Sequence, residues 1–136
     1  MGRPIRIAAA IITDDRGRLL LVRKAGTAVF MQAGGKLRPS ETPLMALRRE
    51  LFEEIGVELD PERPPAYRGI FQADAANEPG RRVEAHLFDL RVSRDVRPGA
   101  EIAEVIWIDP QAPVTVALAP LTRLYALDPS ESGERL

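Results

Sequence analysis

The sequence predicts an α/β (α+β) fold in which a mixed β-sheet lies between helices. Apolar, strand-like segments separated by turn residues run through most of the chain. One helix with clear start and stop signals interrupts them, and no regular strand–helix–strand alternation is visible. The 136 residues are enough for one domain and too few for two, so we expect a single domain over residues 1–136.

The first half of the chain begins with two predicted strands. Residues 5–13 are apolar and rich in isoleucine, and residues 18–23 are similarly apolar. Between them, residues 14–17 have the composition of a turn. We then expect a short extended piece around residues 30–32, followed by a loop at the glycine pair Gly34 and Gly35.

The clearest predicted element is a helix from Pro43 to about Ile55. Thr42 is a favoured N-cap residue, and proline is favoured at the first helical position. Gly56 is suited to a left-handed C-terminal cap. Apolar residues recur at helical spacing and predict a buried stripe made of Leu44, Leu47, Leu51 and Ile55.

The second half is predicted to be mainly β. Residues 60–65 form a rigid connector, and strands are expected over residues 67–73, 82–92 and 103–108, with a turn at 76–80 between the first two. A short helix over residues 120–127 should bury Leu121, Leu124 and Leu127. Residues 128–136 are polar, and we expect a flexible tail there.

The composition excludes several classes of protein. With 45% hydrophobic residues, 29% charged residues and a net charge of −1, the chain lacks the charge excess of a nucleic-acid or membrane-binding surface. Without cysteine there is no disulfide, thiolate zinc site or cysteine nucleophile. No apolar run approaches the roughly 18 residues that span a bilayer, and the N-terminus lacks the pattern of a secretory signal. We therefore expect a cytoplasmic protein.

The most informative stretch gathers carboxylates beside the glycine pair. Glu50, Glu53 and Glu54 are spaced so that their side chains leave one face of the predicted helix. Like charges at this spacing repel one another unless positive charge lies between them. A hard cation such as Mg²⁺ or Mn²⁺, which prefers oxygen ligands, would supply that charge. The competing interpretation is an ordinary solvated helix face.

The surrounding residues favour the metal site. Gly35, Glu41, Arg49, the three glutamates and Gly56 stand at fixed offsets, with apolar residues at 51 and 57. This pattern resembles the signature of the Nudix hydrolases, G-x5-E-x7-R-E-U-x-E-E-x-G-U with U apolar, and every fixed position is met. The resemblance implies an α/β/α sandwich that hydrolyses a nucleoside diphosphate linked to another group, using Mg²⁺ or Mn²⁺. Ala33 and Ser40 replace a common proline and a common glycine, so loop geometry near the metal is expected to differ slightly.

The resemblance also implies roles for the residues of the signature. Glu53 and Glu54 would be metal ligands, and Glu50 would be a third ligand or the general base. Arg49 would pair with one of these glutamates and fix its rotamer. Glu41 would contact the metal through water or would be a favourable charge near the helix start. Gly35, or its neighbour Gly34, would offer a backbone carbonyl to the metal.

Outside the signature the indications are fewer. Glu101 lies where many relatives carry a further metal-binding acid, with Glu104 as its rival and a strand-edge charge as the alternative. Arg23 and Lys24 follow the second strand and are candidates for binding substrate phosphates, as the equivalent basic residue does in some relatives, with an ordinary exposed strand end as the alternative. His86, the only histidine, is interpreted as a packed or edge residue rather than a base.

The predicted substrate is a small nucleotide. Downstream residues typical of ADP-ribose or dinucleoside polyphosphate hydrolases are missing, as is the upstream coenzyme A signature, so elimination favours a nucleoside triphosphate. The alternative is a non-catalytic Nudix domain that senses a nucleotide, although such domains usually lose acids from the signature. An isomerase of the kind that acts on isoprenoid diphosphates would need a cysteine. Many relatives are homodimers, so self-association is left open.

Overall fold

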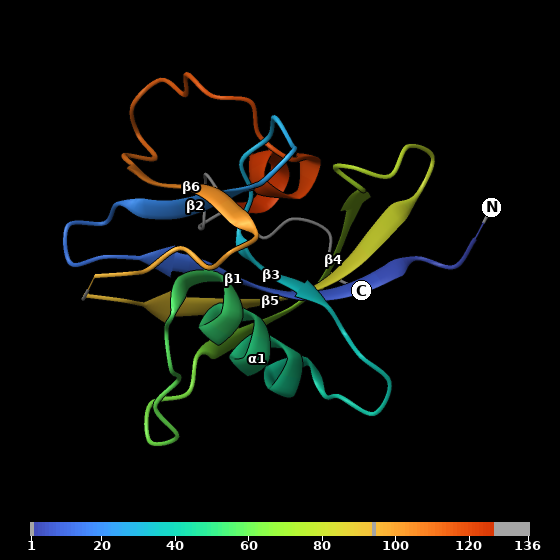
Figure 1. Ribbon diagram of the computed structural model, residues 1–136, viewed down its shortest axis with the longest axis horizontal. Helices are drawn as coiled ribbons and strands as arrows, with labels where there is room; N and C mark the ends of the chain where they lie inside the picture. Colours follow the sequence, from blue (N-terminus) through green and yellow to red (C-terminus); the bar gives the residue numbers. More distant parts are fainter. Residues whose placement is uncertain (1, 94, 127–136) are drawn as a thin grey trace.

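The computed structural model describes residues 2–93 and 95–126 (Figure 1). Within them the elements follow the order of strands and helices expected, with one additional strand. Their bounds are β1 Ile5–Thr13, β2 Leu19–Lys24, β3 Ala33–Lys36, α1 Pro43–Ile55, β4 Ala66–Asp74, β5 Arg82–Arg91, β6 Ile102–Ile108 and η1 Thr122–Ala126. No helix in these two ranges is long and apolar enough to cross a membrane.

The six strands form one mixed sheet with β1 at its centre. The strand order is β4-β5-β1-β2-β6, and β3 also pairs with β1. β1 runs parallel to β5 along its whole length, from Ile5 opposite Val83 to Thr13 opposite Arg91. Its other edge is shared: β3 pairs with it antiparallel, whereas β2 meets it only where Thr13 lies opposite Leu19. The predicted mixed sheet is confirmed.

Two hydrophobic cores cover the two faces of the sheet, because alternate residues of β1 point to opposite sides. On one face, Ala8, Ala10 and Ile12 pack with Leu47, Leu51 and Ile55 of α1. On the other face, Ile5, Ala9 and Ile11 pack with Leu121, Tyr125 and Ala126 of the terminal segment. Figure 1 shows α1 below the sheet and η1 above it. The predicted α/β/α sandwich is confirmed, with only a short helical segment as its second layer.

The glycine pair does not form the loop that the sequence predicted. Gly34 and Gly35 belong to β3, where they lie opposite Ala9 and Ala8 of β1. Gly34 has a φ of 152°, and a Cβ on it would lie 2.2 Å from the carbonyl oxygen of Ala8. The two backbones approach closely at these positions because the paired residues are alanines on β1 and glycines on β3. The prediction of a loop was therefore wrong, since glycine also marks close contact between strands.

The terminal helix is also different from the prediction. Helical structure runs from Pro120 to Ala126, but its main part, η1, has π-helical hydrogen bonding. Leu121 is buried as expected, whereas Leu124 is 54% exposed. The wider π-helical turn changes which residues share a face, so Thr122, Tyr125 and Ala126 are buried instead. Leu127 and the predicted tail at 128–136 lie outside the described residues.

Both ends of α1 are capped as the sequence predicted. The Thr42 hydroxyl oxygen accepts a hydrogen bond from the Met45 N–H at 3.2 Å, and Gly56 adopts a left-handed conformation with φ 69°. Beyond these caps, the loop before β6 provides a second set of donors: the Arg97 N–H donates to the Ile55 carbonyl and the Gly99 N–H to the Glu54 carbonyl. This loop fixes the end of the helix that carries the acidic residues.

Candidate active site

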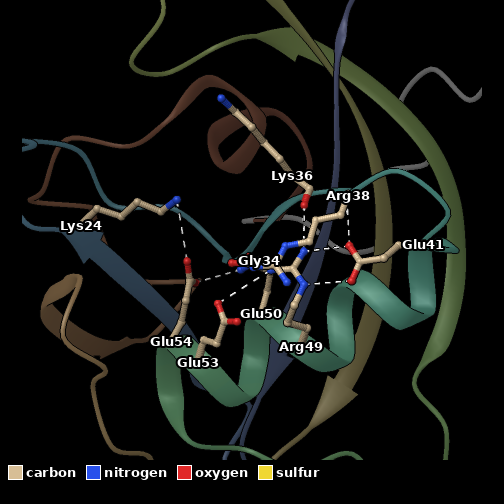
Figure 2. Close-up of polar contacts among 9 residues, drawn as sticks. All are labelled: Lys24, Gly34, Lys36, Arg38, Glu41, Arg49, Glu50, Glu53 and Glu54. Carbon is tan, nitrogen blue, oxygen red and sulfur yellow. Dashed lines mark hydrogen bonds and ion pairs between the residues drawn. The ribbon is translucent and has the colours of Figure 1, made fainter.

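The three glutamates of α1 lie in three different environments. Glu54 is only 5% exposed and faces the sheet. The Glu50 side chain is mostly buried, whereas the Glu53 side chain is half exposed. Figure 2 shows all three near the strand that carries Gly34. The acids thus form a series from the protein interior to solvent, and they are not equivalent members of one solvated face.

Arg49 is the centre of a network of acids. Its Nε and Nη2 donate to the two carboxylate oxygens of Glu41, at 2.9 and 2.8 Å. Its Nη1 donates to Glu50 and lies 3.7 Å from a carboxylate oxygen of Glu53 (Figure 2). Its Nη2 also donates to the Lys36 carbonyl in β3. The prediction that Arg49 pairs with a glutamate of the signature is confirmed. Arg49 contacts three of them, Glu41, Glu50 and Glu53.

The Arg49 guanidinium changes the charge balance of the site. Hydrogen bonds from Arg49, followed by one from the Arg38 N–H, lower the pKa of Glu41 to about 2, and the pKa of Arg49 is raised in turn. The positive charge that we expected between the acids is therefore supplied by a residue of the chain itself. Crowding of the acids does not by itself require a metal ion.

Glu54 is the carboxyl of the cluster whose pKa is raised. Burial raises its pKa to about 7, against the opposing effects of the Gly34 N–H and the Lys24 charge. The Gly34 N–H donates to Glu54 Oε1 at 3.0 Å, and Lys24 Nζ lies 3.7 Å from Oε2 (Figure 2). Charge on Glu50 and Glu101 also acts to raise this pKa. Glu54 is thus a buried carboxyl whose negative charge is only partly compensated.

Gly35 provides the surface against which Glu50 rests. A Cβ at Gly35 would lie 2.4 Å from Glu50 Oε2 and 2.5 Å from its carboxyl carbon. Any larger residue in this position would therefore displace the carboxylate. The glycine pair has two separate functions in the fold: Gly34 allows close approach to β1, and Gly35 leaves room for Glu50.

The candidate residues at the end of β2 separate into two groups. Lys24 lies against Glu54, and the charge of Glu101 affects the same carboxyl, so both belong to the cluster. Arg23 instead donates through Nε to Glu104 at 3.0 Å and through Nη1 to the Thr27 carbonyl at 2.8 Å. Arg23 and Glu104, the rival of Glu101, are thus paired with each other.

The donor set fits a hard divalent cation in kind. Glu50, Glu53, Glu54 and Glu101 offer carboxylate oxygens, which Mg²⁺ and Mn²⁺ prefer, and the buried Glu54 carboxyl lacks a full counter-charge. In the part of the chain that the structure describes, no three acidic or histidine side chains are already grouped around one point. Arg49 and Lys24 hold these side chains in the present arrangement.

A cavity of about 140 Å³ lies beside the cluster, on the face of the sheet that carries η1. Its apolar wall is made by Ile5, Ile7, Ala9, Val83 and Leu121, and its border with the acids by Lys24, Gly34 and Gly35. Gln32 and Thr122 also line it. Lys36, Asp74, Asn77 and Glu78 line it as well, the last two from the turn at 76–80, so its wall is mainly but not wholly apolar. The contribution of Gln32 and Thr122 was not predicted from the sequence.

His86 is packed, as the sequence indicated. Its Nδ1 lies 2.8 Å from the Tyr67 hydroxyl, and its side chain is 6% exposed in the pairing of β4 with β5. Burial, followed by the nearby charge of Arg6, lowers its pKa. His86 does not line the cavity described above.

Comparisons with known proteins agree with this geometry. The NUDIX domain model matches residues 3–126. A CTP pyrophosphohydrolase of Escherichia coli is 31% identical over 121 residues, which cover 85% of this chain and 84% of that protein. A nucleoside triphosphatase, NudI, of an Enterobacter species is 30% identical over 87% of this chain and 91% of its own length.

The fold has the same relatives. The crystal structure of a MutT NUDIX hydrolase from Burkholderia pseudomallei superposes with a TM-score of 0.77, at 23% identity, over 93% of this chain and 97% of that one. The family match spans nearly all the residues described, and Glu50, Glu53 and Glu54 of the signature lie together on α1. The chain therefore belongs to the Nudix hydrolase family.

Proposed function

We propose that this Nudix hydrolase cleaves a pyrophosphate bond of a nucleoside triphosphate in the presence of Mg²⁺ or Mn²⁺. The observation that carries the proposal is the position of Glu50 and Glu54 against β3, at the border of a cavity whose wall is mainly apolar. Phosphates are charged and a nucleobase is mainly apolar, so a substrate with both parts matches the two neighbouring surfaces.

The names of related proteins support this substrate class. Besides the CTP pyrophosphohydrolase and the nucleoside triphosphatase, an 8-oxo-dGTP diphosphatase of Haemophilus influenzae is 42% identical over 57 residues, 39% of this chain. Each of these names describes a protein that acts on a nucleotide carrying a chain of phosphates. We propose the same class of substrate for this chain.

The reaction would be attack of water on one phosphorus of the triphosphate. A new P–O bond forms, the bridging P–O bond breaks, and a nucleoside monophosphate and pyrophosphate are released. A carboxylate of the cluster, Glu50 or Glu54, accepts the proton of the water. A bound divalent cation would neutralise phosphate charge and lower the pKa of a coordinated water.

The side chains have complementary roles in this proposal. Glu53, Glu54 and Glu50 would hold the cation, with Glu101 and the Gly35 carbonyl as further oxygen donors. Lys24, which already faces the cluster, would move from Glu54 to a phosphate when the cation replaces it. Arg23 would contribute at most by exchanging Glu104 for a phosphate. Glu41 would hold Arg49, because its oxygens already accept three hydrogen bonds.

A nucleotide panel with and without added metal tests the proposal. Turnover should require Mg²⁺ or Mn²⁺ and stop on chelation. Substitutions Glu53→Gln and Glu54→Gln should lower kcat/KM by about 10²–10⁴-fold. Glu62→Gln, which alters an exposed acid outside the helix, should leave it unchanged.

A metal titration separates the roles of the three acids. Loss of a ligand raises the metal concentration at half-maximal rate, whereas loss of the proton acceptor lowers kcat at saturating metal. Tight nucleotide binding without turnover in the presence of metal would contradict the proposal and indicate a sensor domain.

A further inference from the structure

Gln32 is a polar residue in the wall of an apolar cavity. It precedes β3 and is only 6% exposed. Its side-chain oxygen, Oε1, accepts a hydrogen bond from the Thr122 hydroxyl at 2.8 Å. Thr122 is fully buried in η1 and lines the same cavity. The pair therefore links the strand side of the cavity to its helical side.

The other end of the same amide is unsatisfied. Gln32 Nε2 is buried and has no hydrogen-bond partner within the described ranges 2–93 and 95–126. Buried side-chain donors are nearly always paired, because an unpaired one loses its bonds to water without replacement. A methionine of similar shape would fill the space without an unpaired donor, although it would give up the hydrogen bond from Thr122. The stability of the fold does not explain this donor, but a ligand would.

Thr122 determines what the amide can recognise. Because the Thr122 hydroxyl donates to Oε1, the amide plane is fixed and its free end is an N–H₂ group. That group can only donate a hydrogen bond, so its partner must be an acceptor. The cavity wall is mainly apolar but also contains Lys24, Lys36 and Asn77. A carbonyl oxygen on a flat ring is an acceptor that fits such a wall beside the Gln32 donor.

The position of the cavity indicates which part of a ligand enters it. Lys24, Gly34 and Gly35 line it and also contact the acid cluster. Its volume of about 140 Å³ is roughly ten times the space that one water molecule needs. A nucleotide with its phosphates at the cluster would thus place its base in the cavity.

We propose that Gln32 is a specificity-determining residue that donates through Nε2 to a ring carbonyl oxygen of the substrate's base. The inference rests on the proposed function and extends it to the class of base. Guanine, hypoxanthine, uracil, thymine and cytosine carry a ring carbonyl, whereas adenine carries none. The protein should therefore discriminate against adenine nucleotides, since they leave the buried donor unpaired or force it onto a ring nitrogen.

Inosine triphosphate and adenosine triphosphate test this discrimination, because the two bases differ at carbon 6 and its neighbouring nitrogen. We expect kcat/KM for the inosine nucleotide to be at least about tenfold higher in the wild-type protein. Gln32→Met should bring the ratio close to one by lowering the rate with the inosine nucleotide. Thr122→Val should reduce the ratio in part, because it frees the amide to rotate.

Two controls separate recognition from folding. Gln111→Met makes the same chemical change at an exposed position that does not line the cavity, and its ratio should equal that of the wild type. Gln32→Met and Thr122→Val each remove one partner of the same buried hydrogen bond, so thermal unfolding of the ligand-free protein should show Gln32→Met to lose no more stability than Thr122→Val. A clearly larger loss in Gln32→Met would show that the rest of the amide serves the fold and would overturn the inference.

The outcomes distinguish this inference from the proposed function. If the wild type hydrolyses both nucleotides equally, or if the ratio survives in Gln32→Met, the inference is wrong and the proposed function stands. If the wild type hydrolyses neither, nor any other nucleotide of the panel, the proposed function fails. Binding of inosine and adenosine, measured by NMR titration, then decides the inference: tighter inosine binding that Gln32→Met removes supports it, and equal binding contradicts it.

Discussion

Arg49 and Glu41 form an ion pair with two hydrogen bonds, from Nε to Oε2 at 2.9 Å and from Nη2 to Oε1 at 2.8 Å. Glu41 precedes the N-cap of α1, whereas Arg49 lies in the middle of the helix. The pair therefore connects the loop that enters the helix to the turn that carries Glu50. The same guanidinium contacts Glu50 directly, so the orientation of that acid depends on the pair.

Arg49→Lys should impair the site more than the fold. Lysine keeps the charge but cannot reproduce the planar pair of donors that Glu41 accepts. We expect kcat/KM to fall by about 10–100-fold, as is common when a residue that supports metal ligands is changed. Arg48→Lys, at the exposed neighbouring position, is the matched control and should change activity by less than about twofold. Equal effects of the two substitutions would contradict a specific role for Arg49.

Gly35→Ala should displace Glu50 without unfolding the protein. The added Cβ would lie 2.4 Å from a carboxylate oxygen, and the end of a glutamate side chain can move away at small cost. We expect near-wild-type thermal unfolding and a loss of kcat/KM of at least about tenfold. Gly2→Ala is the control, because its Cβ would make only ordinary contacts near 3.6 Å. Full activity of the Gly35 variant would mean that the position of Glu50 is unimportant.

Gly99→Ala should have the opposite profile and mainly affect stability. Its Cβ would lie 2.0 Å from the carbonyl oxygen of Glu53, which is backbone and cannot rotate away. The loop would have to leave the end of α1 and break the hydrogen bond to the Glu54 carbonyl. We expect the free energy of unfolding in urea to fall by about 1–3 kcal/mol. An unchanged unfolding midpoint would show that this loop does not hold the helix end.

His86 should lower the stability of the protein in mild acid, whereas Glu54, whose pKa is raised, acts in the opposite direction. Burial and the charge of Arg6 keep the folded-state pKa of His86 below its ordinary value of 6.5, although Glu84 acts in the other direction. Below about pH 6.5 the unfolded chain binds a proton that the folded protein resists. The contribution of His86 to the free energy of unfolding therefore falls as the pH decreases through this range, until its folded-state pKa is passed.

Urea unfolding at about pH 7.5 and about pH 5.5 measures this effect. The wild type should lose more stability between the two values than His86→Gln, which has no imidazole to protonate. Since His86 is the only histidine, its NMR signal reports the folded-state pKa directly. A pKa at or above 6.5 would contradict this explanation.

The sequence was sufficient for the elements whose signals are local. Thr42, Pro43 and Gly56 marked the ends of α1, and both caps are present in the structure. The isoleucine-rich stretch 5–13 became β1 with the expected bounds. The spacing of the signature placed Arg49 beside the glutamates, where it pairs with them.

Features that depend on distant contacts were not predictable in this way. Gly34 and Gly35 have a turn-like composition, and only their pairing with Ala9 and Ala8 makes them a strand. The exposure of Leu124 depends on a π-helical turn that no local pattern indicated. The cavity brings together Gln32 and Thr122, which are 90 positions apart, so it became visible only with the whole fold.

The parallel pairing of β1 with β5 also has a consequence for biosynthesis. Thr13 lies opposite Arg91, so the central strand gains its longest partner only after that arginine has left the ribosome. During this interval the nascent polypeptide exposes one of its most apolar segments, an edge that invites association with other chains. Translation speed and chaperone supply over the first two thirds of the message should therefore determine the yield of folded enzyme.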